Sequence, residues 1–553
     1  MNHESWRSVT PQFDNFSSTI KQYQSIPQNS VLGCQPRLGK TLKRFSQLSG
    51  VAKILTIKAP DNTVYHRLFV EALQQVSANT VSVVSSGSLD MRDILGSYSV
   101  DKQGNVSSSK PGAIAQAEGG FLIVSANLIT QNPLAWFKLK AAILGEEVET
   151  YNATPTRLTT QTVKQSHNVK LVILGDRVTL DDMQHLDGDI NNGINLYTEY
   201  EPEIELTEES IASYLGFVRW LSDHYSLPPL TPDSLIQVMK EGARHTEDQR
   251  YMPLDVIWYR SLLEEAALES SQDSTKALST DDIENAIEER YYRESYLPER
   301  ALSDIFDGQV IIETKGETVG QVNGLTVIDV PGHPRPYGEP ARISCVIHFG
   351  DGDISDVERK AELGGNLHAK GMMIMQAFVS SALKLDEPLP YSASVVFEQS
   401  YCEVDGDSAS LAELCSFVSA LSEYPINQQI AVTGAVDQFG RVQAVGGLNE
   451  KIEGFYHVCR HQGITGKQGV ILPKSNLKHL ALHKDVIESI KKEEFHIWSV
   501  SNVDEAVPIL MGHPFRGENE ASVISHIDKR INNYERHEVP EGMLTRIIKN
   551  WLN

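Results

Sequence analysis

The chain has 553 residues, of which 41% are hydrophobic, so it can form several domains with large buried cores. Its formal net charge of −24 repels phosphate groups, and we therefore do not expect DNA or RNA as its main partner. No run reaches the roughly 18 apolar residues of a membrane span, and the polar N-terminus lacks the apolar segment of a signal peptide, so we expect a cytoplasmic protein without membrane partners.

Residues 1–200 alternate between apolar strand patterns and helical patterns. Strands are expected over residues 53–57, 81–84, 120–124 and 169–174, and helices over residues 63–75 and 134–144. Strands that alternate with helices are typical of an α/β fold with a parallel sheet. We therefore predict an α/β domain over residues 1–200.

The loop after the first of these strands lacks the features of a phosphate-binding loop. Such a loop is rich in glycine, because its backbone N–H groups cradle phosphate. Residues 58–65 contain no glycine and carry the carboxylate of Asp61. The segment GKT at residues 39–41 resembles the end of the motif, but no strand precedes it and Cys34 stands where the first glycine is required. The sequence argues against ATP hydrolysis and leaves weak nucleotide binding open.

Residues 201–300 are rich in helical patterns. Apolar residues recur at helical spacing over 211–218 and again over 258–266. We expect a helical subdomain here and assign it no chemistry.

Ser408 lies in the segment EVDGDSAS, residues 403–410, directly before an apolar pattern of helical spacing that Pro425 ends. We expect Ser408 at the N-terminus of this helix. The free backbone N–H groups and the positive end of the helix dipole would stabilise the oxyanion that forms when a serine attacks a carbonyl group. The alternative is that Ser408 is an N-cap and that the acidic residues before it form a solvated turn.

Lys451 follows a hairpin pattern, with strands expected over residues 428–434 and 441–445, and a Gly446-Gly447 break. It lies in the first turn of the next expected helix, where the dipole disfavours a cation. Burial would lower its pKa further, and a neutral amine can take a proton from a serine. The alternative is an exposed lysine paired with Glu450 or Glu453.

Three segments together resemble the proteolytic domain of the Lon protease family, over about residues 299–511. They read FEQSYCEVDGDSAS (397–410), AVTGAVDQFGRVQAVGGLNEKIEGF (431–455) and GVILPKSN (469–476), in the family's order and spacing. Asp407 stands before the serine where bacterial A-type Lon enzymes carry proline, which favours the B-type or archaeal-like branch. Residues 111–124 are similar to the strand that carries the acidic pair of an AAA+ ATPase.

The resemblance implies a serine endopeptidase with Ser408 as nucleophile and Lys451 as general base. Thr433 matches the threonine that helps to position the lysine, and Asp407 is a second supporting candidate. Ser125 and Ala126 replace the acidic pair that would hold Mg²⁺, so the implied AAA+ module is degenerate and we expect no cofactor and no metal.

The resemblance also divides the chain. It implies a degenerate AAA+ α/β domain over residues 1–200, a lid-like helical subdomain over 201–300, an α+β proteolytic domain over 301–515 and a charged tail over 516–553. The expected substrates are peptides or unfolded proteins. The expected partner is the chain itself, in a homo-oligomer such as a hexameric ring.

Several alternatives stay open. The chain could be a proteolytically silent scaffold or holdase, or an ATP-dependent Lon enzyme with a divergent nucleotide site. Cys402 lies near Ser408 and is a weaker candidate nucleophile, while His368 and His457 are the nearest candidates for a Ser-His-Asp triad. The five cysteines are scattered without a C-x-x-C pair, which favours a reducing compartment and argues against a cysteine metal site.

Overall fold

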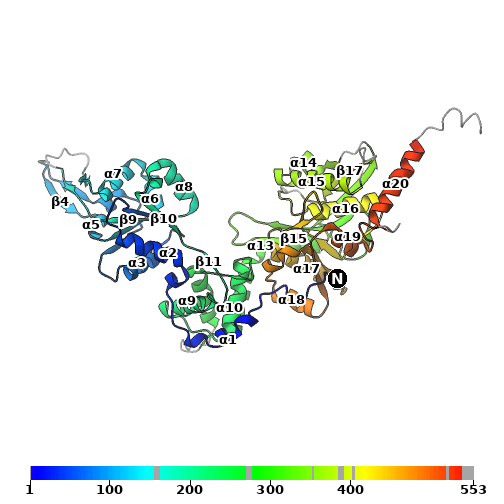
Figure 1. Cartoon of the computed structure of the whole chain (residues 1–553), viewed down its shortest axis with the longest axis horizontal. Coiled ribbons are helices and arrows are strands. Elements are labelled where there is room, and N and C mark those ends of the chain that lie inside the picture. Colours follow the sequence, from blue (N-terminus) through cyan, green and yellow to red (C-terminus); the bar gives the residue numbers. More distant parts are fainter. Residues whose placement is uncertain are drawn as a thin grey trace, which may run out of the picture. The chain divides into compact units, whose positions relative to one another are not determined.

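A computed structural model describes residues 2–154, 162–269, 277–350, 354–383, 391–400, 405–517 and 522–538 (Figure 1). Contacts divide the chain into two compact units. The parallel-sheet unit comprises Ser18–Leu230 and Pro253–Ala277, and the mixed-sheet unit comprises Met1–Ser17, Thr231–Met252 and Leu278–Asn553. Cys402, the segment 270–276 and the tail beyond residue 538 lie outside the described residues.

Five parallel strands form the sheet of the parallel-sheet unit, in the order β10-β1-β9-β5-β2. All four strands expected in this region are present. The central strands read as almost continuous apolar runs because helices cover both faces of the sheet. The bounds are β1 Ile54–Lys58, β2 Val83–Ser86, β5 Phe121–Ser125, β9 Lys170–Gly175 and β10 Asn195–Glu199.

Helices α2 and α3 contact one face of this sheet, and the apolar side chains of α4 to α8 form a single core with the other face. Gly39, Lys40 and Thr41 lie inside α2, which begins with a proline, so they form no loop after a strand. The bounds are α2 Pro36–Gln47, α3 Thr63–Val76, α4 Met91–Leu95, α5 Ala113–Gln116, α6 Ala126–Gln131, α7 Pro133–Leu144 and α8 Arg177–Leu186.

Smaller elements complete this unit. A three-stranded sheet has the order β4-β3-β7, and β6 pairs with β8. The bounds are α1 Ser17–Lys21, β3 Ser97–Val100, β4 Val106–Lys110, β6 Val148–Glu149, β7 Tyr151–Asn152, β8 Lys164–Gln165 and β11 Glu203–Glu205. The short strand β12, Tyr251–Pro253, falls at the boundary between the two units in the sequence.

The helices expected over residues 201–300 contribute to both units. α9 (Ile211–His224) and α11 (Val256–Glu269) belong to the parallel-sheet unit, whereas α10 (Pro232–His245) and α12 (Thr280–Glu294) belong to the mixed-sheet unit. A capping box begins each of α10 and α12. In each, the side chain of the N-cap residue (Thr231 or Ser279) accepts the backbone N–H of the residue three positions later, and that residue's side chain accepts the N-cap backbone N–H.

The mixed-sheet unit contains a seven-stranded sheet in the order β16-β17-β15-β14-β19-β22-β23. β15 runs antiparallel to β14 and β17, whereas β19 runs parallel to β14 and β22. The bounds are β13 Glu317–Thr318, β14 Gln321–Ile328, β15 Tyr337–Phe349, β16 Ile354–Asp356, β17 Tyr391–Phe397, β18 Ile426–Asn427, β19 Ile430–Val432, β20 Ala435–Val436, β21 Val442–Gln443, β22 Gln468–Pro473 and β23 Phe495–Val500.

Helices pack on both faces of this sheet, with α15 and α16 on one face and α17 and α18 on the other (Figure 1). Ile471 of β22 belongs to the core on the α16 face, and its neighbours Val470 and Leu472 belong to the core on the α17 face. The bounds are α13 Tyr296–Phe306, α14 Val357–Lys360, α15 Asn366–Leu383, α16 Ser410–Ser422, α17 Leu448–Gln462, α18 Lys484–Lys491, α19 Val503–Met511 and α20 Val523–Glu538.

The α/β fold class is therefore confirmed. Within the described ranges, no helix combines the length and the apolar character that crossing a bilayer requires.

Candidate active site

The start of α16 and the start of α17 meet at the carboxyl end of β19. The strand ends at Val432, and the next two residues continue toward the segment that carries Ser408. Gly434 donates its backbone N–H to the Ser408 carbonyl over 2.9 Å, and Leu411 donates to the Gly434 carbonyl over 3.1 Å. These bonds attach the serine segment to the end of the strand. The carboxyl ends of parallel strands are where α/β folds place their ligands.

Ser408, Lys451 and Thr433 lie together at this point. The Lys451 Nζ atom is 3.1 Å from Ser408 Oγ and 3.5 Å from Thr433 Oγ1. Thr433 donates its hydroxyl to the Ser408 carbonyl over 3.3 Å. The threonine therefore contacts both the amine and the backbone of the serine, and it limits how far either can move.

Lys451 is buried, with 2% of its surface exposed, whereas Ser408 is half-buried. Burial lowers the pKa of Lys451 to about 8, against the opposing charge of Asp407. Asp407 itself is exposed. The amine is thus partly neutral near physiological pH, which is the state in which it can accept a proton.

Helix α16 begins two residues later than expected. Its N-cap is Ala409, and Ser410 donates its backbone N–H to the Asp407 carbonyl over 3.1 Å. That bond closes a turn over residues 407–410, with Ser408 inside the turn rather than at the cap. The expectation that Ser408 occupies the helix N-terminus is wrong by two residues, and the alternative that it is the N-cap is wrong by one. The turn directs the Ser408 side chain toward Lys451.

Close backbone packing holds α17 in place. Gly447 begins the helix in the left-handed region, with φ of 65°. A Cβ on Gly338 of β15 would lie 2.1 Å from the Glu450 carbonyl oxygen, and one on Gly454 would lie 2.0 Å from the Gly338 carbonyl oxygen. Glycine at these positions lets the helix rest directly on the strand, so the height of Lys451 above the sheet is determined by backbone contact.

A hairpin lies between serine and lysine, but its strands differ from those expected. β20 pairs with β21 over two residues each. The strand expected over residues 428–434 contains only the three residues of β19, which pairs with β14 and β22 in the seven-stranded sheet. The Ser410 hydroxyl accepts the Val436 N–H over 3.0 Å, so β20 is joined to the start of α16. Hydrogen bonds between side chains and the backbone replace backbone hydrogen bonds between strands here. The alternation of apolar residues in the sequence cannot predict them.

A buried cluster of ionisable groups that the sequence analysis missed lies behind the serine segment. His368 of α15 is 3.2 Å from Asp356 and 3.5 Å from Glu413 of α16. Burial raises the pKa of Glu413 to about 7, and burial also raises the pKa of Glu358. In the described part of the chain, His368 thus pairs with carboxylates rather than with Ser408. The signal was weak because the four residues are far apart in the sequence.

Replacement of Glu413 by glutamine is expected to stabilise the protein at pH 8 and to leave its stability unchanged at pH 5. A carboxyl group whose folded pKa is raised from 4.5 to about 7 binds its proton more tightly in the folded state. Its contribution to stability is therefore lost as the pH rises through this window, by about 3 kcal/mol. The glutamine has no charge to bury. Thermal unfolding at both pH values measures the difference.

The matched control is Glu317→Gln at an exposed carboxylate. It is expected to leave the unfolding temperature unchanged at both pH values. A Glu413→Gln protein that is less stable than wild type at pH 8 would contradict an ionisable buried carboxyl.

In the parallel-sheet unit, the loop after β1 is closed by its own side chains. Asp61 is 2.8 Å from His66 Nε2 and accepts the Ser125 hydroxyl over 2.5 Å. Burial would raise the pKa of Asp61, but these hydrogen bonds outweigh it and lower the pKa. The N-cap Asn62 accepts the Val64 and Tyr65 N–H groups, at 3.0 and 3.2 Å. Two N–H groups that a phosphate could use at this helix start are therefore already satisfied, and a carboxylate lies beside them.

No group of three or more His, Cys, Asp or Glu side chains in the described part has a geometry suited to a metal ion. The site at β19 brings together the side chains of Ser408, Lys451 and Thr433 and the backbone that holds them.

Three family profiles match the chain. The Lon protease (S16) C-terminal proteolytic domain matches residues 397–512, the LonB-like AAA domain matches residues 80–201, and the archaeal LonB AAA+ ATPase LID domain matches residues 229–293. The first match contains Ser408, Thr433 and Lys451.

Full-length relatives agree with the profiles. A protein of Escherichia coli (strain K12) named as a Lon protease homolog is 37% identical over 96% of this chain and 96% of its own length. One of Haemophilus influenzae is 37% identical over 84% of this chain and 77% of its own length. The archaeal Lon protease of Pyrococcus abyssi is 27% identical over 52% of this chain and 27% of its own length. The chain belongs to the Lon protease family.

Proposed function

We propose that this chain is a serine endopeptidase in which Ser408 is the nucleophile and Lys451 is the general base, and that it cleaves peptides or unfolded proteins without hydrolysing ATP. The observation that carries the proposal is a buried amine 3.1 Å from a half-buried hydroxyl. Hydrogen-bond reach between nucleophile and base is the geometric requirement for this chemistry.

The reaction follows from the positions of these groups. Neutral Lys451 takes the proton of Ser408 as its oxygen attacks the peptide carbonyl, and the backbone N–H groups around the start of α16 stabilise the oxyanion. The ammonium of Lys451 then gives that proton to the leaving amine, which leaves an acyl-enzyme. Lys451 next takes a proton from water, which attacks the ester, and the proton returns to Ser408. Thr433 holds the Lys451 amine next to Ser408 throughout these steps.

Independence from ATP is supported by the loop after β1. The Asp61 carboxylate lies where a triphosphate would carry its own negative charge, and Asn62 occupies the Val64 and Tyr65 N–H groups. Without an ATP-driven motor the enzyme would act on chains that are already unfolded. A homo-oligomer such as a hexameric ring is the assembly that the family resemblance implies. Four free cysteines in the described part are buried, which suits a reducing cytoplasm.

Unfolded casein is expected to be cleaved equally fast with and without ATP and Mg²⁺, while a stably folded protein resists cleavage. Gel densitometry measures the cleavage, and a calorimetric titration with ATP is expected to give no heat of binding. Cleavage that requires ATP would contradict the proposal and favour an ATP-dependent enzyme with a divergent nucleotide site.

A further inference from the structure

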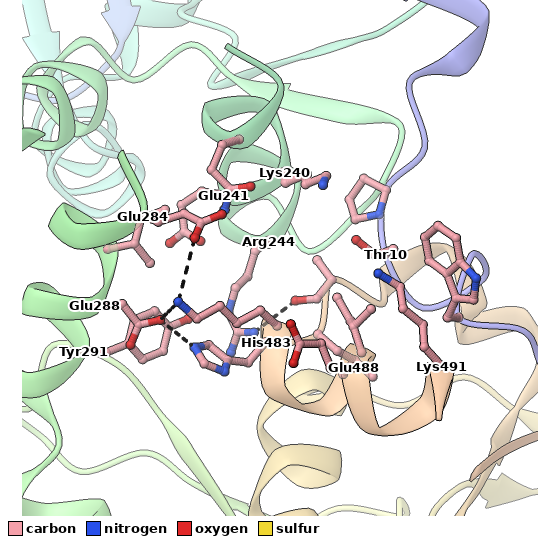
Figure 2. A pocket seen from close by; sticks show the side chains of 18 residues that line it. Thr10, Lys240, Glu241, Arg244, Glu284, Glu288, Tyr291, His483, Glu488 and Lys491 are labelled. Carbon is pink, nitrogen blue, oxygen red and sulfur yellow. Dashed lines mark hydrogen bonds and ion pairs between the residues drawn. The ribbon is translucent and has the colours of Figure 1, made fainter. Parts of the chain in front are cut away.

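A cavity of about 190 Å³ lies in the mixed-sheet unit between α10, α12, α18 and residues 6–11 (Figure 2). Arg244 of α10 and Tyr291 of α12 line it, and His483 lines it from the segment that precedes α18. The Arg244 guanidinium lies 5.6 Å from the centre of the Tyr291 ring. Helix α10 lies inside the segment that matches the LID profile and outside the proteolytic match.

Arg244 binds the helix that carries Lys451. It donates two hydrogen bonds to the Glu453 carboxylate, at 2.6 and 2.9 Å, and a third to Glu450 over 3.4 Å. A fourth bond reaches the Ala481 carbonyl over 3.0 Å. Glu450 and Glu453 flank the proposed base on α17, and the guanidinium therefore holds the helix turn that contains it.

The ion pair between Arg244 and Glu453 is largely buried. The Arg244 and Glu453 side chains are 13% and 12% exposed. Burial would raise the pKa of Glu453, but the charge and hydrogen bonds of Arg244 outweigh burial and lower it. Burial raises the pKa of Glu450. The His483 N–H also donates to Glu453, over 2.8 Å. A bidentate pair in such surroundings is strongly directional, so it fixes the rotation of α17 as well as its distance.

We propose that Arg244 is a positioning residue for Lys451: through Glu450 and Glu453 it holds α17 so that the amine stays within reach of Ser408. This inference rests on the proposed function. β15 supports α17 by backbone contact at Gly338 and Gly454, and Arg244 fixes it through side chains. The LID-like helix α10 thereby acts on the proteolytic site without any nucleotide.

The Arg244→Ala variant is expected to lower kcat for a casein-derived peptide about tenfold or more, with little change in KM, because a small displacement of a general base slows the chemical step. The acid limb of the pH profile is expected to move to higher pH, since two carboxylates near Lys451 lose their counter-charge. Arg244→Lys keeps the positive charge but cannot make the bidentate contact of a guanidinium, and its kcat is expected to lie between those of wild type and Arg244→Ala. Arg460→Ala removes an exposed arginine of the same helix and is expected to change neither property.

Competitive acetylation of Lys451, followed by mass spectrometry across pH, reports its pKa without any cleavage. It is expected to give a higher pKa in Arg244→Ala than in wild type and in Arg460→Ala. An unchanged pKa and an unchanged kcat in folded Arg244→Ala would overturn the inference. An inactive wild type would instead contradict the proposed function, and the acetylation result would still decide the role of Arg244. If Arg244→Ala does not fold, Arg244→Lys decides by the same two readouts.

Discussion

Replacement of Ser408 by alanine is expected to lower casein cleavage by roughly 10⁴- to 10⁶-fold, the loss seen when a serine protease loses its nucleophile. The Ser408 hydroxyl lies 3.1 Å from the buried amine of Lys451. Without it no acyl-enzyme forms. Folding is expected to be unaffected, because Ser408 is neither the N-cap of α16 nor part of the core. Gel-based cleavage and thermal unfolding measure the two properties separately.

Ser416→Ala is the matched control. Its hydroxyl is buried in the same helix and bonds only to the Glu413 carbonyl over 2.8 Å, so the substitution is expected to leave cleavage unchanged. A serine-reactive phosphonate is expected to label wild type at Ser408 and not to label Ser408→Ala. Wild type that neither cleaves nor becomes labelled would instead favour a scaffold or holdase.

The strands of the parallel sheet could be predicted because each buried strand is a run of consecutive apolar residues. β1 and β9 are apolar along almost their whole length, and this pattern requires no knowledge of neighbours. The turn over residues 407–410 could not be predicted in the same way. It depends on one backbone bond from Ser410 to Asp407, and the sequence is equally compatible with a helix that begins at Ser408.

The candidate site was predictable where its residues lie in recognisable local segments. Ser408 and Lys451 are 43 positions apart, and each stands beside a distinctive motif. Arg244 is 209 positions from Glu453 in a helix without a motif, and the pairing becomes visible only after folding. The same holds for His368 and Glu413, whose importance lies in their mutual burial. Pattern reading finds residues that carry chemistry, but it misses the groups that orient them.

Replacement of Lys451 by methionine is expected to lower cleavage by about 10⁴-fold, because methionine fills the same space and cannot accept a proton. Lys451→Arg is expected to be equally inactive, since a guanidinium stays protonated at every usable pH. In wild type, kcat/KM is expected to rise tenfold per pH unit below about 8 and to level off above it, because the free amine is the active form. A pH profile of peptide cleavage checks this. A flat profile between pH 6 and 9 would contradict a lysine base.

The same substitution is expected to stabilise the fold at pH 7, and this separates the role of Lys451 in catalysis from a role in folding. The folded pKa of about 8 lies below the usual lysine value of 10.5. The unfolded chain therefore binds the proton more tightly, and wild type gains stability as the pH rises from 8 to 10.5. Below that window it carries the full penalty of a buried charge, on the order of 3 kcal/mol. Methionine removes the charge, so denaturant unfolding at pH 7 is expected to show a more stable and inactive protein. An inactive variant that is also less stable would mean that Lys451 supports the fold, and its loss of activity would then say nothing about a base.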